Sequence, residues 1–186
     1  MVAQTIPEDR PLTADDFMSL PMDDGHLYEL LQGELILSPS PEMNHQFIVG
    51  NLYFKIRSVL ESVEFGKVIV SPAAVVLSEN DVVEPDVFII RNAQRPLLTR
   101  LSFRGAPVIA LEVLSPSNRS HDLQRKALLY AKAGVEEYWM VDPEKHRVLV
   151  QRLTGAGVDT EIITAGAVTS KVLPELTMDL SEIFAE

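Results

Sequence analysis

Two carboxylates of this sequence stand within or beside strongly apolar stretches. Glu112 lies in the most apolar run of the chain, residues 108–114, and Asp86 follows Pro85 at the start of the apolar run 87–90. A lone ionised carboxylate in such a strand is costly unless it is paired or bound to a metal ion. If the two strands pair antiparallel, Asp86 and Glu112 meet at the same end of a sheet. Two facing carboxylates predict a site for Mg²⁺ or Mn²⁺, which prefer oxygen ligands.

A lysine on the next predicted helix completes a set of residues that could hydrolyse phosphodiesters. Asp122 and Lys126 are four residues apart, so they share one face of a helix. The turn after Glu112 is short, which brings the start of this helix near the carboxylates. A metal ion lowers the pKa of a bound water, and an ammonium stabilises charge on the transferring phosphoryl group. We therefore assign metal binding to Asp86 and Glu112 and catalysis to these two with Lys126, whose position Asp122 would set.

Each of these residues also has a purely structural interpretation. Asp86 could be a turn residue, and Asp122 with Lys126 could be an exposed pair that contributes a few tenths of a kcal/mol. Arg119 or Arg125 could neutralise Glu112 without any metal.

Hydrophobic periodicity indicates the elements that must position the candidate residues. It predicts helices over 13–20, 44–60 and 120–133, the last ended by Gly134. It predicts strands over 28–31, 34–37 (a hairpin with the first), 68–70, 74–77, 82–90, 107–114, 138–141 and 147–153. Residues 91–106 are typical of a loop or irregular helix, and the tail 173–184 should dock on the body. The fold class is α/β, with a mixed α+β sheet.

Length and composition exclude several classes of protein. The chain has 186 residues, 46% of them hydrophobic, which predicts a single domain over 1–186 with a full core. Without cysteine there is no disulfide scaffold, thiolate zinc site or cysteine nucleophile. No glycine-rich nucleotide loop is present, and no apolar run approaches the roughly 18 residues of a membrane span. The start shows no secretory signal, so we expect a cytoplasmic protein with no membrane partner.

Charge is distributed unevenly along the chain. The net charge is −11, which argues against a protein that coats nucleic acid. Residues 91–126 nevertheless hold seven basic and two acidic side chains. This stretch could guide a DNA backbone, or it could simply hold solvated arginines in a loop. The candidate DNA contacts are Arg91, Arg95, Arg100, Arg104, Arg119 and Arg125.

Several motifs together resemble a known family. They are Glu-Pro-Asp at 84–86, Leu-Glu-Val-Leu-Ser-Pro-Ser at 111–117, Asp-Leu-Gln-Arg-Lys at 122–126 and the segment 133–142. With Tyr-Glu-Leu-Leu-Gln-Gly-Glu at 28–34 and Ser-Pro-Ser-Pro at 38–41, they resemble a restriction-endonuclease-like family, long catalogued as a domain of unknown function, in the PD-(D/E)XK nuclease superfamily. The resemblance covers about residues 17–184. It implies a restriction-endonuclease-like αβββαβ core with additional N- and C-terminal β-hairpins, and a metal-dependent endonuclease that hydrolyses DNA, with metal ligands at Asp86 and Glu112.

The chain departs from the superfamily pattern at two places. The usual lysine lies two residues after the second acid, where this chain has Leu114, and the resemblance to related families implies that Lys126 replaces it. The first long helix often supplies an acid, but 44–60 contains none, so Glu34, His45 or Gln46 would complete the site.

We also expect a homodimer, because symmetric dimers are the commonest oligomers and duplex cleavage often needs two sites. Two alternatives stay open. The first is a catalytically weak or inactive nuclease-fold module for nucleic-acid binding or assembly, favoured by the net charge and the displaced lysine. The second is a metal-dependent hydrolase of RNA or another phosphoester.

Overall fold

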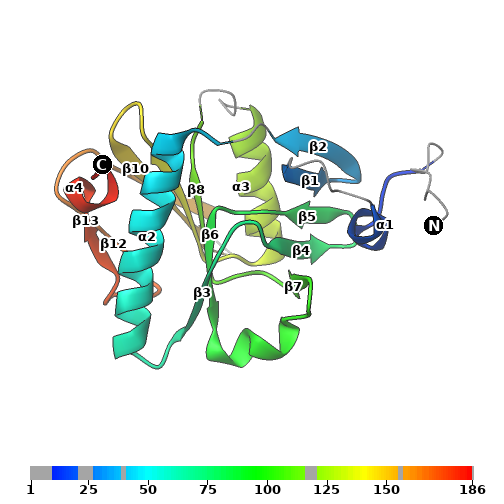
Figure 1. The fold of residues 1–186 in the computed structure, drawn as a ribbon, viewed down its shortest axis with the longest axis horizontal. Helices are drawn as coiled ribbons and strands as arrows, with labels where there is room; N and C mark the ends of the chain where they lie inside the picture. The colour runs from blue at the N-terminus through cyan, green and yellow to red at the C-terminus, as the bar shows by residue number, and fades with distance from the viewer. Residues whose placement is uncertain (1–9, 21–26, 39–40, 116–120, 155–156, 186) are drawn as a thin grey trace.

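A six-stranded mixed sheet runs through the middle of the molecule, in the strand order β11-β10-β9-β8-β6-β3 (Figure 1). The structure is a computed structural model that describes residues 10–20, 27–38, 41–115, 121–154 and 157–185. All neighbours in this sheet are antiparallel except β8 and β9, which are parallel and need a crossover connection. The strands are β3 (Gly66–Val70), β6 (Val87–Arg91), β8 (Ile109–Val113), β9 (Glu137–Asp142), β10 (Arg147–Thr154) and β11 (Gly157–Ile163).

A second sheet of five strands lies beside the first, in the order β2-β1-β5-β4-β7 (Figure 1). Its strands are β1 (Leu27–Leu31), β2 (Glu34–Ser38), β4 (Ala74–Ser78), β5 (Asp81–Val83) and β7 (Ser102–Arg104). A small third sheet pairs β12 (Ala167–Thr169) with β13 (Thr177–Asp179). Residues 84–86 carry the chain from β5 in the second sheet to β6 in the central sheet.

Side chains that alternate along the central strands form two cores on opposite faces of the sheet. Ile89 of β6 shares one buried core with Leu52 of the long helix α2. Its neighbour Phe88 lies in the other core with Tyr130 of α3, the crossover helix between β8 and β9. The helical elements are α1 (Ala14–Ser19), α2 (Met43–Ser62), the 3₁₀ helix η1 (Asn92–Leu97), α3 (His121–Ala133) and α4 (Leu180–Ile183).

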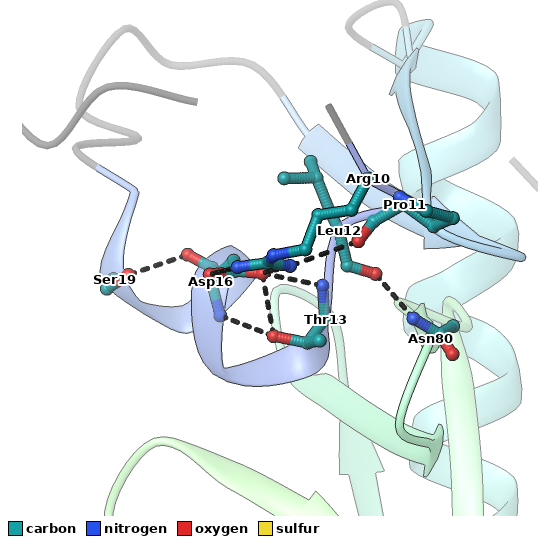
Figure 2. Close-up of polar contacts among 7 residues, drawn as sticks. All are labelled: Arg10, Pro11, Leu12, Thr13, Asp16, Ser19 and Asn80. Atoms are coloured by element: carbon teal, nitrogen blue, oxygen red, sulfur yellow. Dashed lines mark hydrogen bonds and ion pairs between the residues drawn. The ribbon is translucent and has the colours of Figure 1, made fainter. Parts of the chain in front are cut away.

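Helix α1 begins with a capping box, in which Thr13 and Asp16 satisfy each other's backbone N–H groups (Figure 2). Arg10 donates to both carboxylate oxygens of Asp16, at 2.6 and 3.0 Å. The Arg10 guanidinium, and then the bonds from Thr13, hold the pKa of Asp16 well below its usual range. Asn80, in the turn between β4 and β5, contacts this segment through a side-chain hydrogen bond that it donates to the Leu12 carbonyl at 2.8 Å (Figure 2).

The predicted fold class is confirmed. Elements α2, β3, β6, β8, α3 and β9 occur in this order as the expected αβββαβ core, with β4 and β5 inserted after β3 and with η1 and β7 inserted after β6. Hairpins β1–β2 and β10–β11 stand at the two ends, as expected. Gly134 ends α3 with a φ of +95°, a conformation that glycine adopts without strain. Among the described residues, no helix combines the length and the apolar character that crossing a membrane requires.

Two sequence-based expectations are wrong in detail. The strand expected over 82–90 is broken at Pro85, which has no N–H to donate to a ladder, and its two halves belong to different sheets. The segment 91–106 contains η1, as an irregular helix would, but it also contains β7, which pairs parallel with β4.

Candidate active site

The strands β6 and β8 bring Asp86 and Glu112 to the same end of the central sheet. Their antiparallel register pairs Val87 with Leu111, so the next position along each strand sets Asp86 opposite Glu112. Oδ2 of Asp86 accepts a hydrogen bond from the backbone N–H of Val113 at 2.8 Å. The antiparallel pairing of these strands, which was the condition of the sequence argument, is present.

Glu112 is buried beneath helix α3, with only 6% of its surface exposed. Its Oε2 accepts a hydrogen bond from Nζ of Lys126 at 2.9 Å, and its Oε1 accepts one from the hydroxyl of Tyr130 at 2.9 Å. Lys126 and Tyr130 are one helical turn apart, so both reach the same carboxylate. Burial raises the pKa of Glu112; Lys126 opposes this rise, and the carboxylates of Glu29 and Asp86 add to it.

Lys126 lies between two buried carboxylates from different sheets. Its Nζ is 2.8 Å from Oε2 of Glu29 on β1 and 2.9 Å from Oε2 of Glu112 on β8. Although burial favours the neutral amine, the charges of Glu112 and Glu29 raise the pKa of Lys126 well above its usual range. Asp122 belongs to the first turn of α3, but its side chain lies outside the described residues.

Sequence reasoning missed Glu29, and a signal for it was present. Glu29 stands between Tyr28 and Leu30 in a strand rich in apolar residues, and it is only 3% exposed. The argument that singled out Glu112, a charge in an apolar strand, applies to it equally. Tyr130 lies within the helix predicted over 120–133, and its hydroxyl contact with Glu112 was not expected.

Glu84, the first residue of the Glu-Pro-Asp motif, also belongs to the cluster. Its backbone N–H donates to Oε1 of Glu29 at 2.9 Å. Burial, followed by repulsion from Glu29, raises the pKa of the Glu84 carboxyl to about 7, while Lys126 opposes the rise. Oε2 of Glu84 is buried and has no hydrogen-bond partner among the described residues.

Of the three residues proposed to complete the site, His45 contacts a candidate metal ligand. Its Nε2 lies 3.2 Å from Oδ2 of Asp86. His45 also lines a cleft of about 170 Å³ formed by the start of α2, the end of β8 and the turn after β9. Glu34 instead pairs with Arg125 at 3.1 Å, and Gln46 is exposed on α2.

The candidate arginines do not gather around the carboxylates. Arg91 is at the opposite end of β6 from Asp86, about 17 Å away at the usual rise of a strand, and it pairs with Glu136 at 2.9 Å. Arg104 pairs with Asp15 of α1 at 3.1 Å. Three others have these locations: Arg95 in η1, Arg100 exposed between η1 and β7, and Arg125 on α3, where it donates to the Leu31 carbonyl at 2.7 Å. Arg119 lies outside the described residues.

The donor set fits a hard divalent cation. The carboxylates of Glu29, Glu84 and Glu112 lie close enough to Lys126 to interact with its charge, and Asp86 adjoins Glu112, so the cluster is rich in oxygen ligands. Within the described part of the chain, no three His, Asp or Glu side chains are grouped to hold a metal by themselves. Mg²⁺ does not need such a cage, since one or two carboxylates bind it while water and substrate phosphates supply the other ligands.

Comparison with known proteins agrees with this architecture. The Uma2 family model, described as "Putative restriction endonuclease", matches residues 14–181. A crystal structure from Anabaena variabilis, described as "a putative nuclease belonging to DUF820", matches with a TM-score of 0.80 and 22% identity. The match covers 94% of this chain and 98% of that one. This likeness shows the same fold. No curated protein matches the chain.

Proposed function

This chain belongs to the Uma2 family of restriction-endonuclease-like nucleases, and we propose that it is a Mg²⁺- or Mn²⁺-dependent endonuclease that hydrolyses phosphodiester bonds in DNA. The observation that carries the proposal is the placement of Asp86 and Glu112 at one end of the central sheet, with the ammonium of Lys126 beside Glu112. Family membership supports the reaction class, and the carboxylate pair supports the metal.

Asp86 and Glu112 would hold the metal ion. When bound, such an ion lowers the pKa of water and offsets phosphate charge. Tyr130 and Lys126 hold the two oxygens of Glu112 in place. His45 contacts Asp86 and lines the neighbouring cleft, along which the substrate backbone would approach the carboxylates.

Lys126 has a second role in this proposal. An ammonium has three N–H donors; Nζ of Lys126 donates to Oε2 of Glu112 at 2.9 Å and forms an ion pair with Oε2 of Glu29 at 2.8 Å. We assign a remaining donor to a phosphate oxygen, where it would stabilise the charge of the transition state. Asp122, one turn earlier on α3, stays a candidate for setting the position of this lysine.

Plasmid nicking tests the proposal, because a closed circle has no ends and only internal cleavage opens it. We expect the wild type to nick in Mg²⁺ or Mn²⁺ at a fixed, stated salt concentration and to stop in EDTA. Asp86→Asn and Lys126→Ala should be slower by roughly 100-fold, whereas Asp159→Asn, an exposed acid on β11, should match the wild type. Equal cleavage by all four proteins would show that the site is misassigned.

A nuclease-fold module without catalysis is the second candidate function. One observation favours it: both oxygens of Glu112 already have partners inside the protein. Calorimetry with Mn²⁺ separates the two candidates. Uptake in the millimolar range or tighter, lost in Asp86→Asn, supports the endonuclease, and no uptake supports the module.

A cleaving enzyme could act on RNA instead of DNA. A panel of DNA and RNA substrates at one salt concentration distinguishes these two, since polyanion affinity depends steeply on salt. We expect faster cleavage of DNA.

We also propose that the enzyme is a homodimer whose two sites cut the two strands. Sedimentation would measure this oligomeric state.

A further inference from the structure

One buried side chain of the N-terminal hairpin touches both segments that carry the candidate site. Glu29 on β1 is only 3% exposed. Its Oε1 accepts the backbone N–H of Glu84 at 2.9 Å, and its Oε2 lies 2.8 Å from Nζ of Lys126. Glu84 is two residues before Asp86, and Lys126 contacts Glu112. Each oxygen of Glu29 therefore contacts a group that is linked to one of the proposed metal ligands.

The contact with Glu84 holds the segment that crosses between the sheets. Residues 84–86 leave β5 and have not yet entered β6, and Pro85 has no N–H. Backbone groups in such a segment lack the regular partners of a ladder and must find others. Glu29 supplies the acceptor for Glu84 from the neighbouring strand, and this restrains the segment that ends in Asp86.

The contact with Lys126 places the ammonium between two sheets. Glu112 belongs to the central sheet and Glu29 to the five-stranded sheet, and Lys126 reaches both from α3. A lysine side chain has four flexible bonds, so one carboxylate alone would let Nζ take several positions. Two carboxylates on opposite sides restrict it to one.

The charge of Glu29 distinguishes positioning from simple packing. A glutamine would have nearly the same shape and could accept the Glu84 N–H equally well. Burial of a carboxylate costs more free energy than burial of an amide, so the negative charge of Glu29 needs a buried cation, which is Lys126. We propose that Glu29 is a positioning residue of the nuclease site, which holds Lys126 against Glu112 and restrains the segment that carries Asp86; this inference rests on the proposed function.

Two substitutions of Glu29 test the role of its charge. Glu29→Gln keeps the shape and removes the charge, whereas Glu29→Asp keeps the charge and shortens the side chain. For a positioning anion we expect a kcat order of wild type, then Glu29→Asp, then Glu29→Gln, with the last at least tenfold below the wild type and with little change in KM for plasmid DNA. For a residue that only packs, Glu29→Gln would be the less damaged variant, and that order would overturn the proposal.

A matched control removes the effect of lost stability. Glu137 is a buried glutamate on β9, 1% exposed, that accepts bonds from the Trp139 indole and the Lys171 N–H outside the site. Glu137→Gln should keep kcat within about threefold even if its Tm falls as far as that of Glu29→Gln. If Glu29→Gln does not fold, Glu29→Asp and Glu137→Asp are compared instead. A wild-type kcat in Glu29→Asp would overturn the proposal. A kcat of Glu29→Asp several-fold lower than that of Glu137→Asp would support it.

Lys126→Gln and the double variant separate this inference from the proposed function. If the wild type does not cleave, or if Lys126→Gln cleaves as the wild type does, the proposed function fails. If Lys126→Gln is inactive and Glu29→Gln is fully active, only the inference fails. Because Glu29 acts through Lys126, Glu29→Gln/Lys126→Gln should be no slower than Lys126→Gln alone, and additive losses would contradict this coupling.

Discussion

Asp86 and Val113 are joined across the point where the ladder between β6 and β8 ends. The last backbone pair of that ladder is Val87 with Leu111. Beyond it the Asp86 carboxylate, rather than a backbone carbonyl, accepts the Val113 N–H at 2.8 Å. The side chain proposed to bind metal is thus also the acceptor that continues the strand pairing, and the effects of its charge and of its hydrogen bond can be separated by substitution.

Asp86→Asn should weaken metal binding without unfolding the protein. The amide oxygen of asparagine can still accept the Val113 N–H, but the negative charge is lost. We expect Mn²⁺ affinity, measured by calorimetry, to fall by at least ~10-fold, while the Tm stays within a few degrees. Asp86→Ala removes the acceptor as well and should lower the Tm further. A Tm loss as large in Asp86→Asn as in Asp86→Ala would argue against this separation.

Lys126→Met should destabilise the protein strongly, because it leaves Glu29 and Glu112 buried without their cation. Removal of one partner of a buried ion pair costs about 3–5 kcal/mol in the free energy of unfolding. The loss should be smaller at pH 5 than at pH 8, since the pKa of Glu112 is already raised by burial and a protonated Glu112 needs no cation. Urea denaturation at the two pH values measures both effects.

Lys55→Met is the matched control for that substitution. Lys55 pairs with Glu182 at 3.1 Å but is partly exposed. Its removal should cost less than about 1 kcal/mol at either pH. Losses of similar size in the two variants would mean that the buried ion pairs of Lys126 contribute no more to the free energy of unfolding than an exposed pair does.

Glu84 should make the protein less stable as the pH rises. Its pKa is about 4.5 in a free chain and is raised to about 7 in the folded protein, chiefly by burial and then by Glu29. Between these values the folded state holds a proton that the unfolded chain releases, so stability falls as pH increases through this window. Glu84→Gln should therefore stabilise the protein at pH 8 by about 1–2 kcal/mol, a value reduced for the partial exposure of the group, and should change little at pH 4.5.

Urea unfolding in EDTA at both pH values checks this expectation, because a bound metal would itself oppose protonation. Glu79→Gln, an exposed residue in the turn between β4 and β5, is the control and should have the same stability as the wild type at both values. Equal stability of Glu84→Gln and the wild type at pH 8 would mean that the carboxyl of Glu84 titrates normally.

Asp16→Asn should weaken the start of α1 at neutral pH. The pKa of Asp16 lies well below its usual range because Arg10, and then Thr13, bind its ionised form. A lowered pKa contributes stability at pH values above the unfolded pKa, and this contribution is lost as the pH falls below about 4. Hydrogen exchange of the Phe17 amide, which bonds to the Thr13 carbonyl, should be faster in the variant than in the wild type at pH 6, and the difference should shrink at pH 3. An unchanged rate at pH 6 would contradict a capping role.

The sequence predicted much of the central core because long apolar runs and helical spacing reflect burial directly. Glu112 could be found from sequence since a charge within such a run demands compensation. Glu29 was not predicted because hairpin strands usually alternate between core and solvent, whereas β1 is covered on both sides. Leu31 packs in the core that contains Tyr130, and Leu30 packs in a separate cluster with Phe17 of α1.

Other features depend on tertiary placement. Pro85 marks a break in the apolar run 82–90, but the sheet that each half joins is set by pairing with β1 and β8, far away in the sequence. The same holds for the arginines: Arg104 pairs with Asp15, 89 positions earlier in the chain. Three arginines of the basic stretch, Arg91, Arg104 and Arg125, therefore pair with acids in three different parts of the fold.

Two acids at the junction between the sheets accept hydrogen bonds where backbone pairing is interrupted. Asp86 accepts the N–H of Val113, and Glu29 accepts the N–H of Glu84. An amide oxygen can accept the same N–H groups, so backbone pairing alone would tolerate asparagine at position 86 and glutamine at position 29. The negative charges of the two acids exceed what this pairing requires. Metal uptake is therefore the measurement that distinguishes a working site from a purely structural one.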